Sequence, residues 1–248
     1  IEEFKKFAEL GFAGMTIPEQ YGGQKLDDIS EAIVIEELSR VDPSLGVMVA
    51  VHVGLCSMTI ALSGNETQKE KYLPKLASGE FLGAYSLSEA GSGTDAAAMV
   101  AKATDDGDCY TLNGEKMWVT NGTTADLFVL FAKVTDHPDY GKKSHGGVTC
   151  FIIEKGFEGF QIGKKEDKLG IRSSDTCTLI LNNCKVPKEN VLGEVGKGFP
   201  IAMNALDNSR IGIAAQGLGI AQGAYETALK YSKERETFGK PIAAHQSI

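Results

Sequence analysis

Residues 81–120 read FLGAYSLSEAGSGTDAAAMVAKATDDGDCYTLNGEKMWVT, and within this stretch the pattern changes from helical to β. Phe81–Ala90 and Met99–Thr104 are short apolar runs bounded by turn residues, which is typical of strands. Tyr110–Thr120 carries Asn113-Gly114 near its start. An Asn-Gly pair between two strand-like runs predicts a two-residue hairpin turn. The stretch therefore predicts that a β unit begins near residue 81.

The β pattern continues beyond residue 120. Further apolar or alternating runs predict strands, and Gly146-Gly147 and Asn182-Asn183 predict turns between them. The expected strands are Leu127–Val134, Val148–Glu154, Phe160–Ile162 and Thr176–Leu181.

Helical patterns precede and follow this β unit. Val34, Leu38 and Val41 recur at helical spacing, and Asp28 is placed to cap their helix. Asn65 and Gln68 predict a capping box for a helix that reaches Gly79 and contains Pro74, which favours a kink.

The helical pattern returns near Phe199, and a small-residue-rich helix is expected from Ile211 to Lys233. The order predicts an α+β protein with segregated elements. We expect a partial N-terminal helical domain (1–80), a β-barrel-like middle domain (81–190) and the beginning of a C-terminal helical bundle (191–248).

The segment Pro43–Asn65 holds no Asp, Glu, Lys or Arg over 23 residues, which is long enough to cross a bilayer. His52 and several Ser, Thr and Gly residues dilute it, and Pro43 opens it. A buried helix is therefore favoured over a membrane span.

Composition excludes several classes of function. Lys+Arg 25 against Asp+Glu 33 gives a net charge of −8, so a nucleic-acid partner is not expected and an anionic ligand needs local cations or backbone N–H groups. The 5 cysteines are scattered without a C-x-x-C pair, which favours a reducing compartment. The 4 histidines show no metal-binding spacing, and no G-x-S-x-G motif is present.

Several candidate ligand-binding motifs allow two interpretations from the residues alone. Gly91–Ala96 matches G-x-G-x-x-A but leads into strands, so it is either an anion-binding loop or a surface turn rather than a Rossmann site. Trp118 is either a core or half-buried surface residue, or a flat wall for an aromatic cofactor with the Thr120 hydroxyl nearby. Asp207 and Arg210 form either a solvated ion pair or a ligand site. Lys164, Lys165, Lys168 and Arg172 form either a phosphate site or a solvated loop.

Taken in order, the motifs resemble the acyl-CoA dehydrogenase family, and the resemblance covers essentially the whole chain. The matching segments are PEQYGG (18–23), YSLSEAGSGTD (85–95), KMWVTNG (116–122), KLGIRSS (168–174), KVP with NVLG (185–193), and RETFGKP (235–241) with Gln246. The segment from Lys168 to Gln222 is most similar to short-chain, butyryl-type members.

The resemblance implies FAD as cofactor and a CoA thioester as substrate, which loses an α proton to a base and a β hydride to the flavin. The residues that it implies for FAD are Tyr85, Leu87, Ser88, Gly93, Thr94, Trp118, Val119 and Thr120, with Arg235 and Gln246 reaching the FAD of a neighbouring subunit. For the thioester it implies Thr94, Ser174, Asp207 and Arg210.

The resemblance also places the general base outside these residues. The usual glutamate is expected beyond Ile248, and the chain begins at Ile1 within a helical pattern, so we expect the family pattern to extend past both ends. The alternative glutamate of some members falls at Ser209, which cannot act as a carboxylate base. The expected partners are an electron-transferring flavoprotein and identical subunits in a homotetramer, in the bacterial cytoplasm or the mitochondrial matrix, in fatty-acid β-oxidation. Two alternatives stay open: a non-catalytic flavin-binding or assembly subunit, and an acyl-CoA oxidase.

Overall fold

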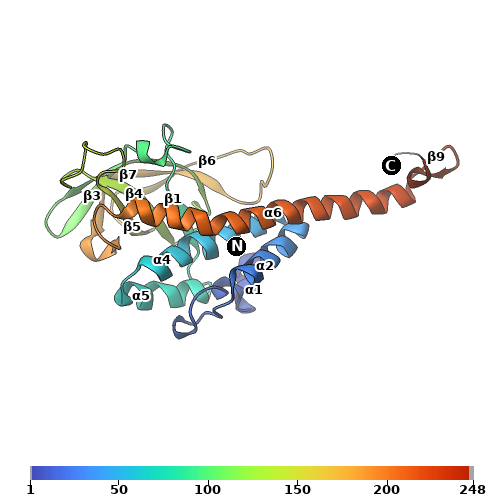
Figure 1. The fold of residues 1–248 in the computed structure, drawn as a ribbon, viewed down its shortest axis with the longest axis horizontal. Coiled ribbons are helices and arrows are strands. Elements are labelled where there is room, and N and C mark those ends of the chain that lie inside the picture. Colours follow the sequence, from blue (N-terminus) through green and yellow to red (C-terminus); the bar gives the residue numbers. More distant parts are fainter. Residues whose placement is uncertain (1, 246–248) are drawn as a thin grey trace.

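The computed structural model describes residues 2–245 as a helical part, a β-sheet and one long helix (Figure 1). This arrangement confirms the expected α+β class, with its elements segregated along the chain. The helices of the first part are α1 (Glu2–Glu9), α2 (Asp28–Val41), α3 (Pro43–Ala50), α4 (Met58–Ser63) and α5 (Glu66–Ala77). The predicted boundaries at 80/81 and 190/191 stay a prediction.

Side-chain caps define where two of these helices begin. Asp27, not Asp28 as predicted, caps α2, and its carboxylate accepts a hydrogen bond from the N–H of Ser30. The two aspartates are adjacent, so the sequence pattern alone does not distinguish them. The capping box of Asn65 and Gln68 is confirmed at the start of α5. Helix α5 continues past Pro74 to Ala77.

The apolar segment over Pro43–Ser63 consists of α3, a π-helical stretch at Val51–Ser57, and α4. It is long and apolar enough to cross a membrane, with a mean hydropathy of 2.1, but 67% of its most apolar window is buried inside the protein. His52 in the π-helical stretch is buried between two backbone groups. Its Nε2 donates to the carbonyl of Leu76 (3.1 Å), and its Nδ1 accepts from the N–H of Gly83 (3.0 Å). The segment thus packs as a core helix and ties the helical part to the sheet.

The sheet has eight strands, and β4 lies near its middle. The pairing path is β6-β7-β3-β2-β4-β5-β8, with β1 pairing in parallel with the first half of β4. The strands at the two ends of this path, β6 and β8, are not hydrogen-bonded to each other. The strands are β1 (Gly83–Ser86), β2 (Lys102–Asp105), β3 (Cys109–Thr120), β4 (Leu127–Val134), β5 (Val148–Glu154), β6 (Phe160–Lys165), β7 (Thr176–Pro187) and β8 (Val191–Leu192). The ranges predicted for β4 and β5 are confirmed.

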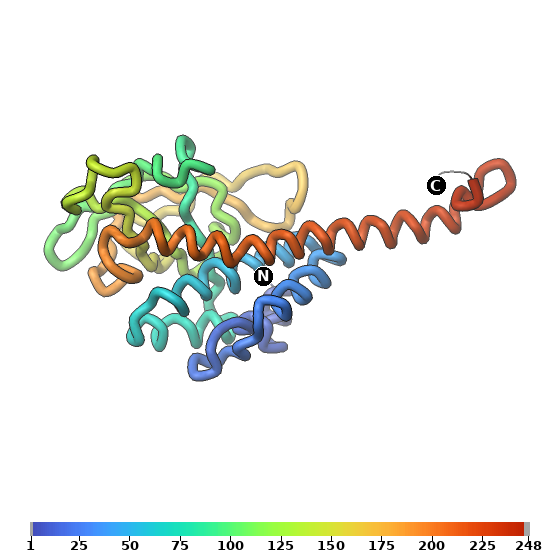
Figure 2. Tube along the Cα trace, in the orientation of Figure 1, coloured from blue at the N-terminus to red at the C-terminus, as the bar shows by residue number. Residues whose placement is uncertain are grey.

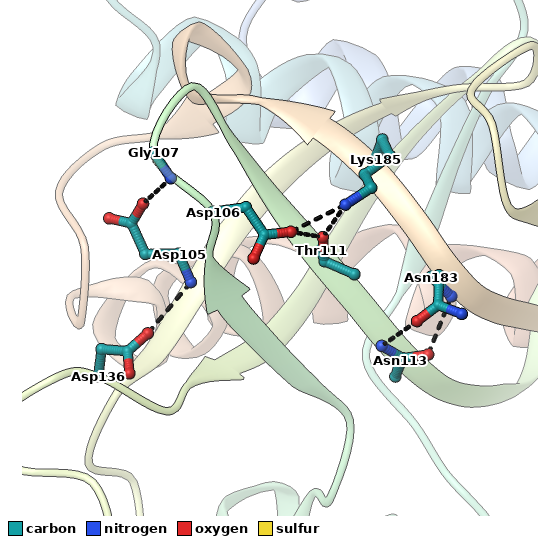
Figure 3. Close-up of polar contacts among 8 residues, drawn as sticks. All are labelled: Asp105, Asp106, Gly107, Thr111, Asn113, Asp136, Asn183 and Lys185. Atoms are coloured by element: carbon teal, nitrogen blue, oxygen red, sulfur yellow. Dashed lines mark hydrogen bonds and ion pairs between the residues drawn. The ribbon is translucent and has the colours of Figure 1, made fainter.

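The predicted hairpin turn at Asn113-Gly114 is wrong. Strand β3 runs through this pair, and the turn between β2 and β3 lies earlier, where the Asp105 carboxylate accepts from the N–H of Gly107 (2.9 Å; Figure 3). Asn113 instead faces a β-bulge in β7. Its side chain accepts a hydrogen bond from the N–H of Asn183 (2.9 Å), whose φ is 52°. The Asn-Gly pair therefore marks a bulge between two long strands.

Other strand predictions differ in length. Residues Asn182-Asn183 lie inside β7 instead of forming a turn, because the bulge absorbs them. The strand expected over Phe81–Ala90 is only β1, and the one over Met99–Thr104 begins at Lys102, since the residues between form a loop.

Helix α6 (Gly198–Glu234) is one continuous helix, longer than predicted. Its small residues let α2 approach closely: a Cβ at Gly219 would lie 2.2 Å from the carbonyl oxygen of Glu36, and one at Gly223 would lie 2.3 Å from that of Arg40. The far half of α6 projects away from the body and ends in the short hairpin of β9 (Glu236–Thr237) and β10 (Lys240–Pro241) (Figures 1 and 2).

Candidate functional site

A pocket of about 280 Å³ lies where the π-helical stretch, the sheet and α6 meet, and we call it the central pocket. Six of the residues implied for flavin line it: Tyr85, Leu87, Ser88, Gly93, Trp118 and Thr120. The other lining residues are Val51, Leu55, Met117 and Leu206, all apolar. Segments far apart in the sequence thus converge on one concave surface with a few hydroxyl groups, as in a typical small-molecule site.

A β-bulge presents Trp118 to this pocket. The pairing of β3 with β7 shifts between Lys116 and Val119, so Met117 and Trp118 together oppose one residue of β7. The backbone of Trp118 is left-handed, with a φ of 60°, which is uncommon outside glycine. Trp118 is 59% exposed as a residue, so it does not belong to the core. An exposed indole held by a bulge is a preformed flat surface for a ligand.

A buried ion pair supports both walls of the pocket. The Lys116 ammonium lies 2.7 Å from the Glu89 carboxylate, and the two side chains are 0% and 4% exposed. Lys116 also donates to the carbonyl of Leu87 (3.0 Å), while Glu89 accepts from the N–H groups of Val100 (2.6 Å) and Ala101 (3.1 Å). Burial lowers the pKa of Lys116, and the charge of Glu89 acts in the opposite direction. The pair thus fastens the loop after β1 to β3.

Sequence reasoning missed this pair. In the sequence, Glu89 is only one residue of the segment 85–95, and Lys116 is a lysine in a predicted strand that also contains other polar residues, so neither residue indicates the pair. Because each partner directly adjoins a pocket residue, Ser88 or Met117, the pair controls how the two walls face each other.

Tyr85 contributes a neutral phenol to the pocket. It is 9% exposed, and its hydroxyl lies 3.5 Å from the carbonyl of Ala202 in α6. Burial raises the pKa of Tyr85 well above its usual value. Tyr85 therefore stays protonated at ordinary pH and is unsuited to act as a base.

The remaining residues implied for FAD lie outside the pocket lining. Thr94 is exposed on the loop after Gly93, and Val119 is buried behind the wall at 1% exposure. Arg235 is exposed at the end of the projecting half of α6. Gln246 lies outside the described residues.

The residues implied for the thioester are spread over three segments: Thr94 in the loop after β1, Ser174 before β7, and Asp207 and Arg210 on α6. Ser174 is buried at 2% exposure just before β7. Asp207 and Arg210 form a loose ion pair of 3.5 Å on α6, and both side chains are 75% exposed. Asp207 directly follows Leu206 of the central pocket, and Arg210 lies about one turn further along α6.

The basic segment of residues 164–172 does not form one cluster. Lys168 turns inward and donates to the hydroxyl of Thr176 (2.9 Å), and Arg172 pairs with Asp167 on the surface (3.1 Å). Lys164 and Lys165 are exposed on β6.

Three family models match the chain in succession. They are the acyl-CoA dehydrogenase N-terminal domain over residues 1–80, the middle domain over residues 84–184, and the C-terminal domain over residues 196–248. The chain belongs to the acyl-CoA dehydrogenase family.

Individual relatives of this acyl-CoA dehydrogenase family member agree with these matches. The short-chain specific acyl-CoA dehydrogenase of Clostridium acetobutylicum is 48% identical over 100% of this chain and 64% of its own length. The butyryl-CoA dehydrogenase of Megasphaera elsdenii superposes with a TM-score of 0.94 at 45% identity, over 99% of this chain and 64% of that one. An acyl-CoA dehydrogenase of Bacillus anthracis, solved with FAD, gives a TM-score of 0.90 at 43% identity, over 97% and 40%. The chain thus spans about 64% of the length of its curated relative.

Proposed function

We propose that this chain forms the FAD site, and part of the substrate site, of a short-chain acyl-CoA dehydrogenase. The observation that carries the proposal is the convergence of Tyr85, Leu87, Ser88, Gly93, Trp118 and Thr120 on the central pocket. Family membership and the similarity to short-chain and butyryl-CoA dehydrogenases support it.

The residues present fit a flavin. An isoalloxazine is a flat aromatic ring with polar edges, and the pocket offers the exposed indole of Trp118 beside the hydroxyls of Ser88 and Thr120. When bound, FAD would supply the acceptor for the hydride that leaves the β carbon. Trp118 would fix the ring plane and exclude water, and the Thr120 hydroxyl would donate a hydrogen bond to the ring edge.

The apolar lining supports a short acyl chain as the second ligand. Val51, Leu55 and Leu206 bring three aliphatic side chains from two helices to the pocket, with no charged group among them. Burial of a saturated chain against them is favourable by about 25 cal/mol per Å² of apolar surface. We propose that Thr94, Ser174, Asp207 and Arg210 contact the CoA portion.

The base that removes the α proton is proposed to be a glutamate beyond Ile248. Among the described residues, no carboxylate or imidazole lines the central pocket. Glu89 is buried close by, but its carboxylate already accepts hydrogen bonds from Lys116 and two backbone N–H groups. It is therefore poorly suited to receive a proton from substrate.

The partners that we propose are an electron-transferring flavoprotein and further copies of this chain in a homotetramer. The projecting half of α6 supports the oligomer, because it leaves large aromatic side chains uncovered (Figure 1). Tyr225 and Tyr231 on α6 are 60% and 57% exposed, and Phe238 just after α6 is 96% exposed. Arg235 would reach the FAD of a neighbouring subunit. Relatives are bacterial or mitochondrial, so the bacterial cytoplasm or the mitochondrial matrix is the proposed location.

An anaerobic titration with butyryl-CoA tests this function, using an FAD-loaded form of the enzyme that includes the glutamate proposed beyond Ile248. We expect the oxidised-flavin absorption band to bleach, and the reduced enzyme to be reoxidised faster by an electron-transferring flavoprotein than by oxygen. An unchanged band would favour the alternative of a binding or assembly subunit. Faster reoxidation by oxygen would favour an acyl-CoA oxidase.

A further inference from the structure

Gly83, the first residue of β1, lies where the π-helical stretch packs directly against the sheet. A Cβ at this position would lie 2.6 Å from the Sγ of Cys56 and 2.7 Å from the Cβ of Cys56. Both distances are far below the separation of about 3.5–4.0 Å at which carbon atoms pack. A glycine inside a strand weakens the strand and often marks the close approach of another backbone. The contact of Gly83 with Cys56 therefore fixes how near the π-helical stretch lies to β1.

Both backbone groups of Gly83 are bound by buried side chains. The N–H of Gly83 donates to the Nδ1 of His52 (3.0 Å), and its carbonyl accepts from the Nδ2 of Asn121 (3.1 Å). His52 and Asn121 are each 0% exposed. Among the described strands, β1 pairs only with β4, so these two side chains take the place of a second neighbouring strand. We call Gly83, His52 and Asn121 the Gly83 clamp.

Asn121 extends the clamp to two further segments. Its Nδ2 also donates to the carbonyl of Met48 in α3 (3.1 Å), and its N–H donates to the carbonyl of Asp175 before β7 (3.1 Å). The Oδ1 of Asn121 is buried and has no hydrogen-bond partner in the part of the chain that the structure describes. A buried acceptor without a partner is costly. We therefore attribute the Asn at this position to its two side-chain N–H donors, each of which meets a carbonyl.

The clamp lies behind two walls of the central pocket. The π-helical stretch supplies Val51 and Leu55, which form an aliphatic wall. On the other side, β1 supplies Tyr85 and β3 supplies Thr120, which form the flavin wall. No residue of the clamp lines the pocket itself. The clamp thus sets the separation of the two walls without contacting a ligand.

We propose that the Gly83 clamp restricts the enzyme to short acyl chains by holding the aliphatic wall close to the flavin wall. The inference rests on the proposed function, because it concerns the size of the acyl site. A Cβ at position 83 would push Cys56 away from β1 by roughly 1 Å, from 2.7 Å to ordinary contact. Val51 and Leu55 lie on the same stretch and would move with it. The pocket would then accept a longer chain.

The ratio of kcat/KM for octanoyl-CoA to kcat/KM for butyryl-CoA tests this role, in an FAD-loaded form that continues past Ile248. Gly83→Ala should raise the ratio at least about tenfold, since one methylene group in an apolar pocket is worth about that factor. Gly14→Ala is the matched control. Its Cβ would lie 2.8 Å from the Cβ of Ala77, a similar clash, but neither residue lines the central pocket. This control should leave the ratio unchanged.

Asn121→Gly releases the clamp without adding a side chain, and it decides the question alone if Gly83→Ala does not fold. Asn121 has a φ of 65°, a left-handed conformation that glycine adopts readily. The hydrogen bonds to Gly83 and Met48 are lost, so the ratio should again rise. Asn183→Gly is the control, because Asn183 is also left-handed (φ 52°) and forms side-chain hydrogen bonds in β7. It should keep the wild-type ratio.

A compensating change separates the clamp from a general loss of stability. Gly83→Ala combined with Cys56→Gly removes the clashing Sγ and Cβ from the opposite side of the contact, and should return the ratio toward the wild-type value. An unchanged ratio in the clamp variants that fold, or an equal rise in the controls, would overturn the proposal and leave the proposed function intact. If the wild-type enzyme oxidises neither thioester, the proposed function fails and this inference fails with it.

Discussion

At the scale of single residues, Trp118 is the side chain on which the proposed flavin site depends most. We expect Trp118→Ala to weaken FAD binding at least about tenfold, because the flat wall of the pocket is removed. FAD content after gel filtration and the flavin spectrum would show the loss. Leu10→Ala removes an apolar side chain of similar exposure (69%) just after α1, away from the central pocket, and is the control. Normal FAD content and an unaltered spectrum in Trp118→Ala would contradict the assignment.

The buried pair of Lys116 and Glu89 predicts that removing one charge destabilises the protein more than removing both. Lys116→Met leaves an unpaired carboxylate in the interior and should cost about 3–5 kcal/mol in the free energy of unfolding. Glu89→Gln combined with Lys116→Met removes both charges and should recover part of that loss. Urea unfolding measures both. Lys6→Met, which breaks the exposed Lys6–Glu3 pair, should cost under about 1 kcal/mol. If the double variant is as unstable as Lys116→Met, the loss of stability does not come from the unpaired carboxylate of Glu89.

His52 predicts a pH dependence of stability. Burial lowers the pKa of His52 from 6.5 to about 4, because a charged ring would lose its hydration, while the hydrogen bond to the carbonyl of Leu76 acts in the opposite direction. Between these values the unfolded chain binds a proton that the folded chain does not, so stability is full above about pH 6.5 and falls as the pH drops toward 4. The loss is roughly 3 kcal/mol. Urea unfolding at several pH values measures it, and His52→Gln should remove this part of the slope. A slope identical in that variant would exclude His52 as its cause.

At the scale of elements, the strands show what the sequence predicts well. Leu127–Val134 and Val148–Glu154 were predicted correctly because each is a continuous buried run with turn residues at its ends. The hairpin at Asn113-Gly114 was wrong because the same dipeptide also suits a bulge, and its partner, Asn183, is 70 residues away. The residues of the central pocket could be predicted, because they lie in recognisable motifs. The bulge at Trp118 and the contact of Glu89 with Lys116 could not be predicted, because both depend on pairing between distant segments.

The close approach of Ala101 to Gly114 in β3 gives its own prediction. Gly114 has a φ of 144°, and a Cβ there would lie 2.9 Å from the Cα of Ala101. Gly114→Ala should therefore destabilise the protein by about 1–3 kcal/mol in urea unfolding. Gly156→Ala, at a position with no atom within 4 Å of the added Cβ, is the control and should change stability by less than about 0.5 kcal/mol. Equal effects at both sites would show that position 114 does not require glycine.

At the scale of the whole molecule, the helical part, the sheet and α6 meet at the central pocket. His52, Tyr85 and Leu206 lie near this junction, one in each part, so ligand binding and the packing of the three parts are coupled. A ligand that binds only the folded state adds to stability by mass action. The same geometry leaves the pocket without a carboxylate of its own among the described residues.

The most direct measurement compares residues 1–248 with a longer form that continues past Ile248. Both are loaded with FAD and titrated anaerobically with butyryl-CoA while the flavin band is followed. We predict that residues 1–248 bind FAD weakly and show no bleaching, because no positioned base reaches the α proton, whereas the longer form bleaches. Flavin reduction by residues 1–248 alone would contradict the account and place the base within the sequence described here.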